Sequence, residues 1–146
     1  MGLGREWIVD AYGCPPARIG GDTGREALTS LFANVIRTLD LHPVSQAVWH
    51  VFSAHGPATQ GAVTGMVALA ESHLTCHSDP ASGWLSVNLS CTRPDLSPDW
   101  RGLLTRFVGA HEVSVQVVER GRAPAQPAAA PLVVAAQAPA AASQVS

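Results

Sequence analysis

The sequence of 146 residues contains no lysine, and its nine strongly basic residues are all arginine. Enzymes that use pyridoxal phosphate hold this cofactor as a Schiff base on a lysine, so the sequence excludes that chemistry. Charged residues are also scarce, at 14%, and the formal net charge is −2. Proteins that bind nucleic acids normally present a basic surface stripe. We therefore expect no nucleic-acid partner.

Long apolar runs are absent from the sequence as well. No run approaches the ~20 apolar residues that a membrane-spanning helix needs. The first ten residues do not have the layout of a signal peptide, because Glu6 and Asp10 interrupt a short apolar stretch. We expect a cytoplasmic protein with no membrane partner.

The sequence has only three cysteines, and their spacing matches no common disulfide or metal-binding motif. Cys14, Cys76 and Cys91 are an odd number and include no CxxC motif, which argues against a disulfide framework. A zinc site built from His73, Cys76 and His77 is conceivable. However, adjacent residues of a strand point to opposite faces, and no fourth ligand has suitable spacing. We predict no bound metal.

Two segments of the sequence have the apolar spacing of a helix with one buried face. The apolar residues of these two segments are Leu28, Leu31, Phe32, Val35, Ile36 and Leu39, and then Trp100, Leu103, Leu104, Phe107 and Val108. Thr23 and Glu26 are spaced as a capping box, which predicts the start of the first helix. Ser97 and Pro98 predict the start of the second helix.

The remaining apolar segments predict the strands 6–12, 46–52, 62–70 (continuing through 73–77), 84–90 and 112–118. This order predicts an α+β fold, a two-layer sandwich in which an antiparallel sheet carries two helices on one face. The other face of the sheet must contact solvent or a second copy. Residues 122–146 are almost entirely Ala, Pro, Gln, Ser and Val, which predicts a disordered Ala/Pro-rich tail after a single domain at 1–121.

The segment 67–77 (VALAESHLTCH) contains the polar residues of greatest chemical interest. Glu71, Ser72 and His73 follow a strand that we expect to be buried, so the backbone there should be rigid. A rigid environment allows a strained peptide to react with its own side chain. The tripeptide alone is a weak signal, since a solvated strand end would look the same.

Four motifs strengthen this interpretation: GREWIVDAYGC, AESHLTCH, VNLSCT and VQVVERGR, which lie in this order within residues 3–122. Together they resemble the prokaryotic S-adenosylmethionine decarboxylase proenzyme family, which is pyruvoyl-dependent. The resemblance implies self-cleavage between Glu71 and Ser72, giving a β chain (1–71) and an α chain (72–146). In this chemistry the Ser72 hydroxyl attacks the Glu71 carbonyl carbon and the amide becomes an ester. Elimination and hydrolysis then leave a pyruvoyl group at position 72 and release ammonia.

The resemblance also implies roles for other residues. Thr64, where the family usually has Ser, would supply a processing hydroxyl, and His77 would accept and donate protons during processing. The pyruvoyl group would form a Schiff base with the substrate amine, with neither pyridoxal phosphate nor a metal. Cys91 would then donate a proton to the substrate carbon. Because the family builds its sites from two protomers, the resemblance implies a homodimer of processed αβ protomers.

The substrate-binding residues match the family less well. The resemblance implies decarboxylation of S-adenosylmethionine, which supplies aminopropyl groups for spermidine and other polyamines. The family commonly has Thr-Trp-Pro-Glu after its processing histidine, whereas this sequence has Ser-Asp-Pro-Ala at 78–81. Phe52 is the candidate to stack on the adenine. Asp79 either attracts a cationic substrate or simply begins a turn with Pro80. Ornithine or arginine therefore stays an alternative substrate, and a non-catalytic homologue stays an alternative function.

Overall fold

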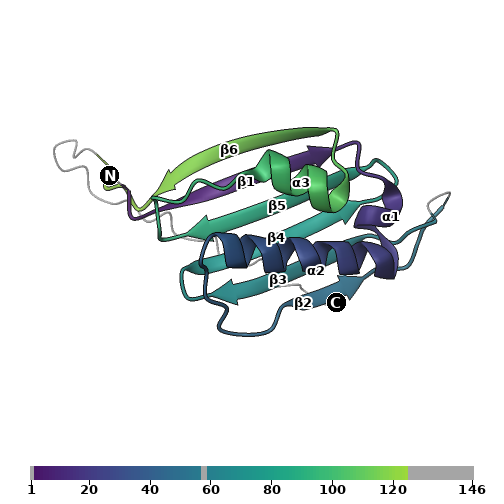
Figure 1. Cartoon of the computed structure of the whole chain (residues 1–146), viewed down its shortest axis with the longest axis horizontal. Coiled ribbons are helices and arrows are strands. Elements are labelled where there is room, and N and C mark those ends of the chain that lie inside the picture. Colours follow the sequence, from purple (N-terminus) through teal and green to yellow (C-terminus); the bar gives the residue numbers. More distant parts are fainter. Residues whose placement is uncertain (1, 57–58, 125–146) are drawn as a thin grey trace, which may run out of the picture.

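The computed structural model describes residues 2–56 and 59–124, and it contains one antiparallel sheet with its helices on one face (Figure 1). The strands run in the spatial order β2-β3-β4-β5-β1-β6. Their bounds are β1 Gly4–Tyr12, β2 Val48–Val51, β3 Val63–Leu69, β4 Ser72–Asp79, β5 Trp84–Cys91 and β6 Glu112–Arg120. The helices are α1 Pro16–Ile19, α2 Gly21–Thr38 and α3 Trp100–Val108. The predicted two-layer α+β sandwich is confirmed. Most of the predicted tail, residues 125–146, lies outside the described residues.

Both predicted helices are present, but the starts predicted for them were wrong. Helix α2 begins at Gly21, and its N-cap, Gly20, makes no side-chain capping hydrogen bond. The preceding short helix α1 packs tightly on α2, since a Cβ at Gly24 would lie 2.5 Å from the backbone of Ile19. This tight packing at the junction of α1 and α2, rather than a capping box at Thr23, sets the start of α2. Helix α3 is capped by Asp99, whose carboxylate accepts a hydrogen bond from the backbone N–H of Gly102 at 3.0 Å.

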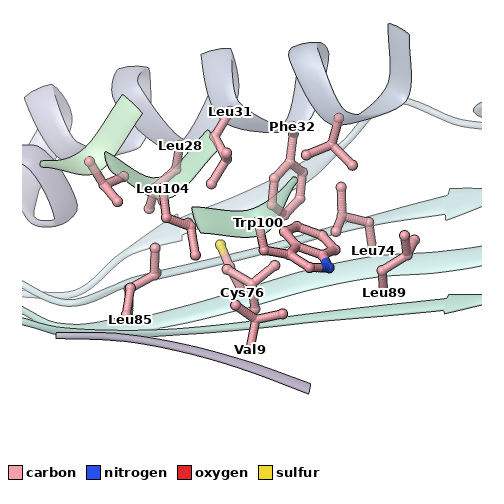
Figure 2. Packing of buried hydrophobic residues seen from close by; sticks show 14 of the residues in the cluster. Val9, Leu28, Leu31, Phe32, Leu74, Cys76, Leu85, Leu89, Trp100 and Leu104 are labelled. Carbon is pink, nitrogen blue, oxygen red and sulfur yellow. The ribbon is translucent and has the colours of Figure 1, made fainter. Parts of the chain in front are cut away.

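The core lies between the helices and the inner face of the sheet. Figure 2 shows side chains of α2 and α3 facing those of the strands. The fully buried members of this cluster include Val9, Leu28, Leu31, Leu74, Leu85, Leu89 and Leu104. Each such side chain contributes up to about 1.5–3 kcal/mol through burial. This packing fixes the strand register, because a slip by one residue would turn the apolar side chains to the other face.

The hairpin between β3 and β4 is held on both sides. Leu69 pairs with Ser72, so that Ala70 and Glu71 form the turn. On one side, the segment after α2 contributes a hydrogen bond from the Ala70 N–H to the His42 carbonyl, at 2.7 Å. On the other side, the N–H of Thr92 donates to the Glu71 carbonyl at 2.9 Å. The peptide between Glu71 and Ser72 is therefore anchored by two separate parts of the chain.

Candidate active site

Ser72 begins β4 with a backbone φ of +150°, which L-residues rarely adopt. Such a conformation costs about 1–3 kcal/mol and persists only where the surroundings enforce it. The hairpin anchors described above provide these surroundings. The Ser72 hydroxyl lies 3.0 Å from Nδ1 of His73 and is hydrogen-bonded to it. The structure thus places backbone strain beside the peptide bond that the sequence predicts to break.

The Glu71 side chain is held by His42, a residue that the sequence did not single out. Nδ1 of His42 lies 2.5 Å from Oε1 of Glu71, and the backbone N–H of His42 donates to Oε2 at 3.2 Å. Burial raises the pKa of the Glu71 carboxyl, but the hydrogen bonds from His42 outweigh it, so the net pKa is lowered. The hydrogen bond to Glu71 raises the pKa of His42. The two residues therefore form an ion pair that holds Glu71 in place.

Cys91 lies opposite Ser72 in the register of β4 and β5. Its side chain is buried, and its sulfur accepts a hydrogen bond from the Arg93 N–H at 3.4 Å. Burial raises the pKa of the Cys91 thiol. A thiol with a raised pKa keeps its proton at neutral pH, so it is available as a donor. The structure places Glu71, Ser72 and Cys91 close together, and the role of Cys91 as a proton donor stays a prediction.

Thr64 and His77 form a separate pair. They lie opposite each other in the register of β3 and β4, and Thr64 Oγ1 is 2.7 Å from His77 Nδ1. His77 follows Ser72 by five positions along β4, which corresponds to about 17 Å at the usual rise per residue of a strand. Within one chain, the Thr64–His77 pair therefore does not reach the peptide predicted to be cleaved.

A cavity of about 320 Å³ lies beside His77. Phe52 and Asp79, the two predicted substrate-binding residues, both line it. The rings of Phe52 and His77 have centroids 6.3 Å apart in an edge-on arrangement. The Asp79 carboxylate accepts a hydrogen bond from the Ser82 hydroxyl at 2.8 Å, so Asp79 also begins a turn. Phe52 and Asp79 therefore line the same cavity as His77, which is hydrogen-bonded to Thr64.

The possible zinc ligands do not converge. Cys76 is buried between the sheet and the helices, where burial raises its pKa to about 12, whereas His73 and His77 are exposed. Within 2–56 and 59–124, no group of three or more His, Cys, Asp or Glu residues could hold a metal ion. In the same part of the chain, no helix has the length and apolar character needed to cross a membrane.

Comparison with known proteins gives consistent results. The sequence model of the S-adenosylmethionine decarboxylase family matches residues 5–121. The S-adenosylmethionine decarboxylase proenzyme of Shouchella clausii is 27% identical over 126 residues, which cover 86% of this chain and 90% of that protein. The corresponding proenzyme of Caldanaerobacter subterraneus is 28% identical over 121 residues, covering 82% and 89%.

The fold is also found among solved structures. The crystal structure of the adenosylmethionine decarboxylase from Aquifex aeolicus superposes with a TM-score of 0.63 at 21% identity, covering 86% of this chain and 97% of that one. This likeness concerns the fold alone. The match of the family model, in contrast, spans nearly the whole region from β1 to β6. The chain belongs to the S-adenosylmethionine decarboxylase family.

Proposed function

We propose that this chain is a self-processing, pyruvoyl-dependent decarboxylase of S-adenosylmethionine. The observation that carries the proposal is the positive φ of Ser72, next to a Glu71 that is anchored through its side chain and its backbone. The decarboxylated product would serve as the aminopropyl donor in spermidine synthesis in the cytoplasm. The family membership of the chain supports the substrate, and the geometry at residues 71 and 72 supports the self-cleavage.

Self-cleavage needs groups of the protein and one water molecule, and no other co-reactant. The Ser72 hydroxyl oxygen bonds to the Glu71 carbonyl carbon, the C–N bond between the two residues breaks, and the hydroxyl proton ends on the freed nitrogen. A base then removes the Cα proton of residue 72, the ester C–O bond breaks, and Glu71 leaves as a carboxylate at the end of the β chain. The dehydroalanine that remains takes up a proton at its methylene carbon and becomes an imine, which water hydrolyses to the pyruvoyl ketone and ammonia. Relief of the strain at Ser72 favours the first step. The His42–Glu71 ion pair keeps the carbonyl carbon in position for the attack.

The surroundings of Ser72 fit a pyruvoyl group at this position. Its ketone would supply the electron sink that takes up the electron pair freed when the substrate loses carbon dioxide. Cys91 lies on the neighbouring strand, opposite Ser72, with a thiol that stays protonated. Cys91 would direct this proton to the substrate carbon. A proton delivered to the pyruvoyl carbon instead would lead to transamination and loss of the cofactor.

A second copy of the chain would complete the site. Thr64 and His77 lie about 17 Å along the strand from Ser72, too far to assist its reaction within one protomer. Both residues lie on the outer face of the sheet, opposite the helices, where Val48 and Met66 are also exposed. A homodimer whose outer faces meet would bring the Thr64–His77 pair of one protomer to the Ser72 of the other. The processing hydroxyl and the proton shuttle would then come from the partner.

The cavity beside His77 suits the proposed substrate. Phe52 presents an aromatic ring on which adenine would stack, and Asp79 provides a carboxylate that would attract the sulfonium cation. Asp79 replaces the Trp that the family commonly has at this position, and Ala81 replaces its Glu. In the dimer, this cavity would lie next to the Ser72 of the partner protomer.

The direct test is release of carbon dioxide from carboxyl-labelled S-adenosylmethionine, ornithine and arginine, each offered separately. Ser72→Ala removes the pyruvoyl precursor, and Ser45→Ala, at an exposed loop position, serves as the matched control. We expect release from S-adenosylmethionine by the wild type and Ser45→Ala, and none by Ser72→Ala. Release of carbon dioxide from ornithine or arginine, with none from S-adenosylmethionine, would overturn the proposed substrate. Full activity of Ser72→Ala would overturn the pyruvoyl mechanism.

A further inference from the structure

The carbonyl oxygen of Glu71 accepts two hydrogen bonds, and both come from Thr92. The backbone N–H donates at 2.9 Å and the hydroxyl Oγ1 at 3.2 Å. The N–H contact continues the ladder between β4 and β5 and would be expected of any residue at this position. The hydroxyl contact is additional, and it depends on the side chain. Together they occupy both acceptor positions of this one carbonyl oxygen.

We propose that Thr92 is a catalytic residue of self-cleavage that stabilises the oxyanion formed at Glu71; this inference rests on the proposed function. When the Ser72 hydroxyl attacks, the electron pair of the Glu71 carbonyl moves onto its oxygen. That oxygen becomes negatively charged, and hydrogen bonds to it are strongest at this stage. The charge returns to form the ester carbonyl as the C–N bond breaks. Thr92 donates hydrogen bonds throughout and transfers no proton.

The position of Thr92 is fixed before the reaction. The neighbouring Arg93 side chain donates to the carbonyls of Leu39 and Asp40 at 3.1 and 2.9 Å. On the other side, the backbone at Gly4 approaches closely, since a Cβ there would lie 3.3 Å from Cα of Thr92. A donor that is held in place needs no reorganisation when the charge develops. Thr92 is therefore preorganised by the segment that follows α2 on one side and by β1 on the other.

Thr92 acts within its own chain, unlike the Thr64–His77 pair. The hydrogen bonds to Glu71 are present in a single protomer, and they join residues 21 positions apart in the sequence. In the proposed dimer, the two chains would therefore contribute different groups to each cleavage reaction. The chain that is cleaved would stabilise its own oxyanion, and its partner would supply the proton shuttle.

Two substitutions separate the hydroxyl from the rest of the residue. Thr92→Val keeps the shape and the N–H but removes the hydroxyl, and Thr92→Ser keeps the hydroxyl. Cleavage is followed over time on denaturing gels after cell-free synthesis, with circular dichroism to confirm folding. We expect Thr92→Val to slow cleavage on the order of 100-fold, as loss of an oxyanion donor does elsewhere, and Thr92→Ser to stay close to the wild-type rate. Wild-type cleavage by Thr92→Val, or equal slowing by both variants, would overturn the assignment.

Hydroxylamine locates the slowed step, because it cleaves esters but not amides. If Thr92 acts on the oxyanion, ester formation is slow in Thr92→Val and hydroxylamine does not restore cleavage. Rapid cleavage by hydroxylamine would place the defect after the ester and overturn the assignment. A wild-type chain that is never cleaved would overturn the proposed function itself. A cleaved wild type beside an equally fast Thr92→Val would overturn only the role of Thr92.

Co-synthesis tests whether Thr92 acts in its own chain. Thr92→Val is made together with Ser72→Ala, which cannot be cleaved but carries an intact Thr92, and tags of different size distinguish the two. We expect the Thr92→Val chain to stay slow in this mixture. Restoration of the wild-type rate by the partner would overturn the assignment within one chain.

Discussion

The carboxylate of Glu71 lies 2.5 Å from the imidazole Nδ1 of His42, although 29 positions separate the two residues in the sequence. The backbone of His42 makes two further contacts with the same turn, one to the Glu71 carboxylate and one from the Ala70 N–H. His42 thus connects Glu71, the residue before the predicted cleavage site, to the segment that follows α2. This contact gives the site a positioning residue outside its sequence motif.

Replacement of His42 tests this positioning role. We expect His42→Ala to slow self-cleavage about 10- to 100-fold, because a Glu71 that is free to move holds its carbonyl carbon less well in line with the Ser72 hydroxyl. His111→Ala is the matched control, since His111 is exposed near the start of β6. The measurement is the rate at which the full-length band disappears after synthesis. Equal rates for His42→Ala and the wild type would contradict the positioning role.

The His42–Glu71 ion pair also predicts a pH dependence of stability. The lowered pKa of Glu71 stabilises the fold above the ordinary carboxyl pKa of 4.5, and this stability is lost as the pH falls through the folded-state pKa. The raised pKa of His42 stabilises the fold below the ordinary imidazole pKa of 6.5, and this stability is lost as the pH rises through the folded-state pKa. The pair is therefore fully effective between about pH 4.5 and 6.5.

The measurement is urea unfolding at several pH values, in a Ser72→Ala background that keeps the chain in one piece. We expect the difference in unfolding free energy between this protein and its His42→Ala derivative to be largest between about pH 4.5 and 6.5. The difference should shrink at more acidic and more basic pH. Its size should be modest, because the His42 ring is largely exposed. A difference that does not change with pH would contradict the ion pair.

The proposed homodimer, with a site built from both protomers, predicts complementation between two inactive chains. Ser72→Ala lacks the cleaved serine, and His77→Ala lacks the proton shuttle, so neither should be processed efficiently alone. Co-synthesis would place the intact His77 of the Ser72→Ala chain beside the Ser72 of the His77→Ala chain. We therefore expect the His77→Ala chain to be cleaved in the mixture, as seen on a gel that separates the two tagged chains. No cleavage in the mixture, together with a cleaved wild type, would show that the partner does not supply His77.

Cys91 should matter after processing, when the substrate is decarboxylated. We expect Cys91→Ala, once cleaved, to release carbon dioxide about 10²- to 10⁴-fold more slowly than the wild type, since it lacks the proton donor. Cys14→Ala is the matched control, because Cys14 is also a buried free thiol but lies beside the turn after β1. Carbon dioxide release is measured with S-adenosylmethionine as substrate. Similar rates for the two alanine variants would rule out Cys91 as the donor.

The sequence predicted the fold well because the periodic apolar residues decide it. The alternation along β5 and the helical spacing in α2 each bury one face, and the layers follow from that burial. The short helix α1 was missed, since only Ile19 of its four residues is buried and no apolar periodicity marks so short a segment. The start of α2 was misplaced for a related reason. Tight packing at Gly24 decided it, and tertiary packing of this kind leaves no local signal.

The candidate site was predictable only where its residues are local to a motif. Glu71 and Ser72 are adjacent, and Cys91 was placed through the resemblance to a family. His42 and Thr92 were not identified. They reach Glu71 only in the folded chain, where the segment after α2 and the segment after β5 both bind the turn between β3 and β4. Ser72 and His77 are only five positions apart in the sequence, but both lie in the extended strand β4. The strand separates them by about 17 Å, which closeness in the sequence did not indicate.

Mass spectrometry of the freshly made intact protein shows whether the chain cleaves itself between Glu71 and Ser72. Self-cleavage predicts two chains, residues 1–71 and 72–146, in place of the single chain of 15.2 kDa. The second chain should resist Edman degradation and be lighter, by one ammonia, than the same chain with an N-terminal serine. A single full-length chain that keeps an ordinary serine at position 72 would rule out self-cleavage and the pyruvoyl group.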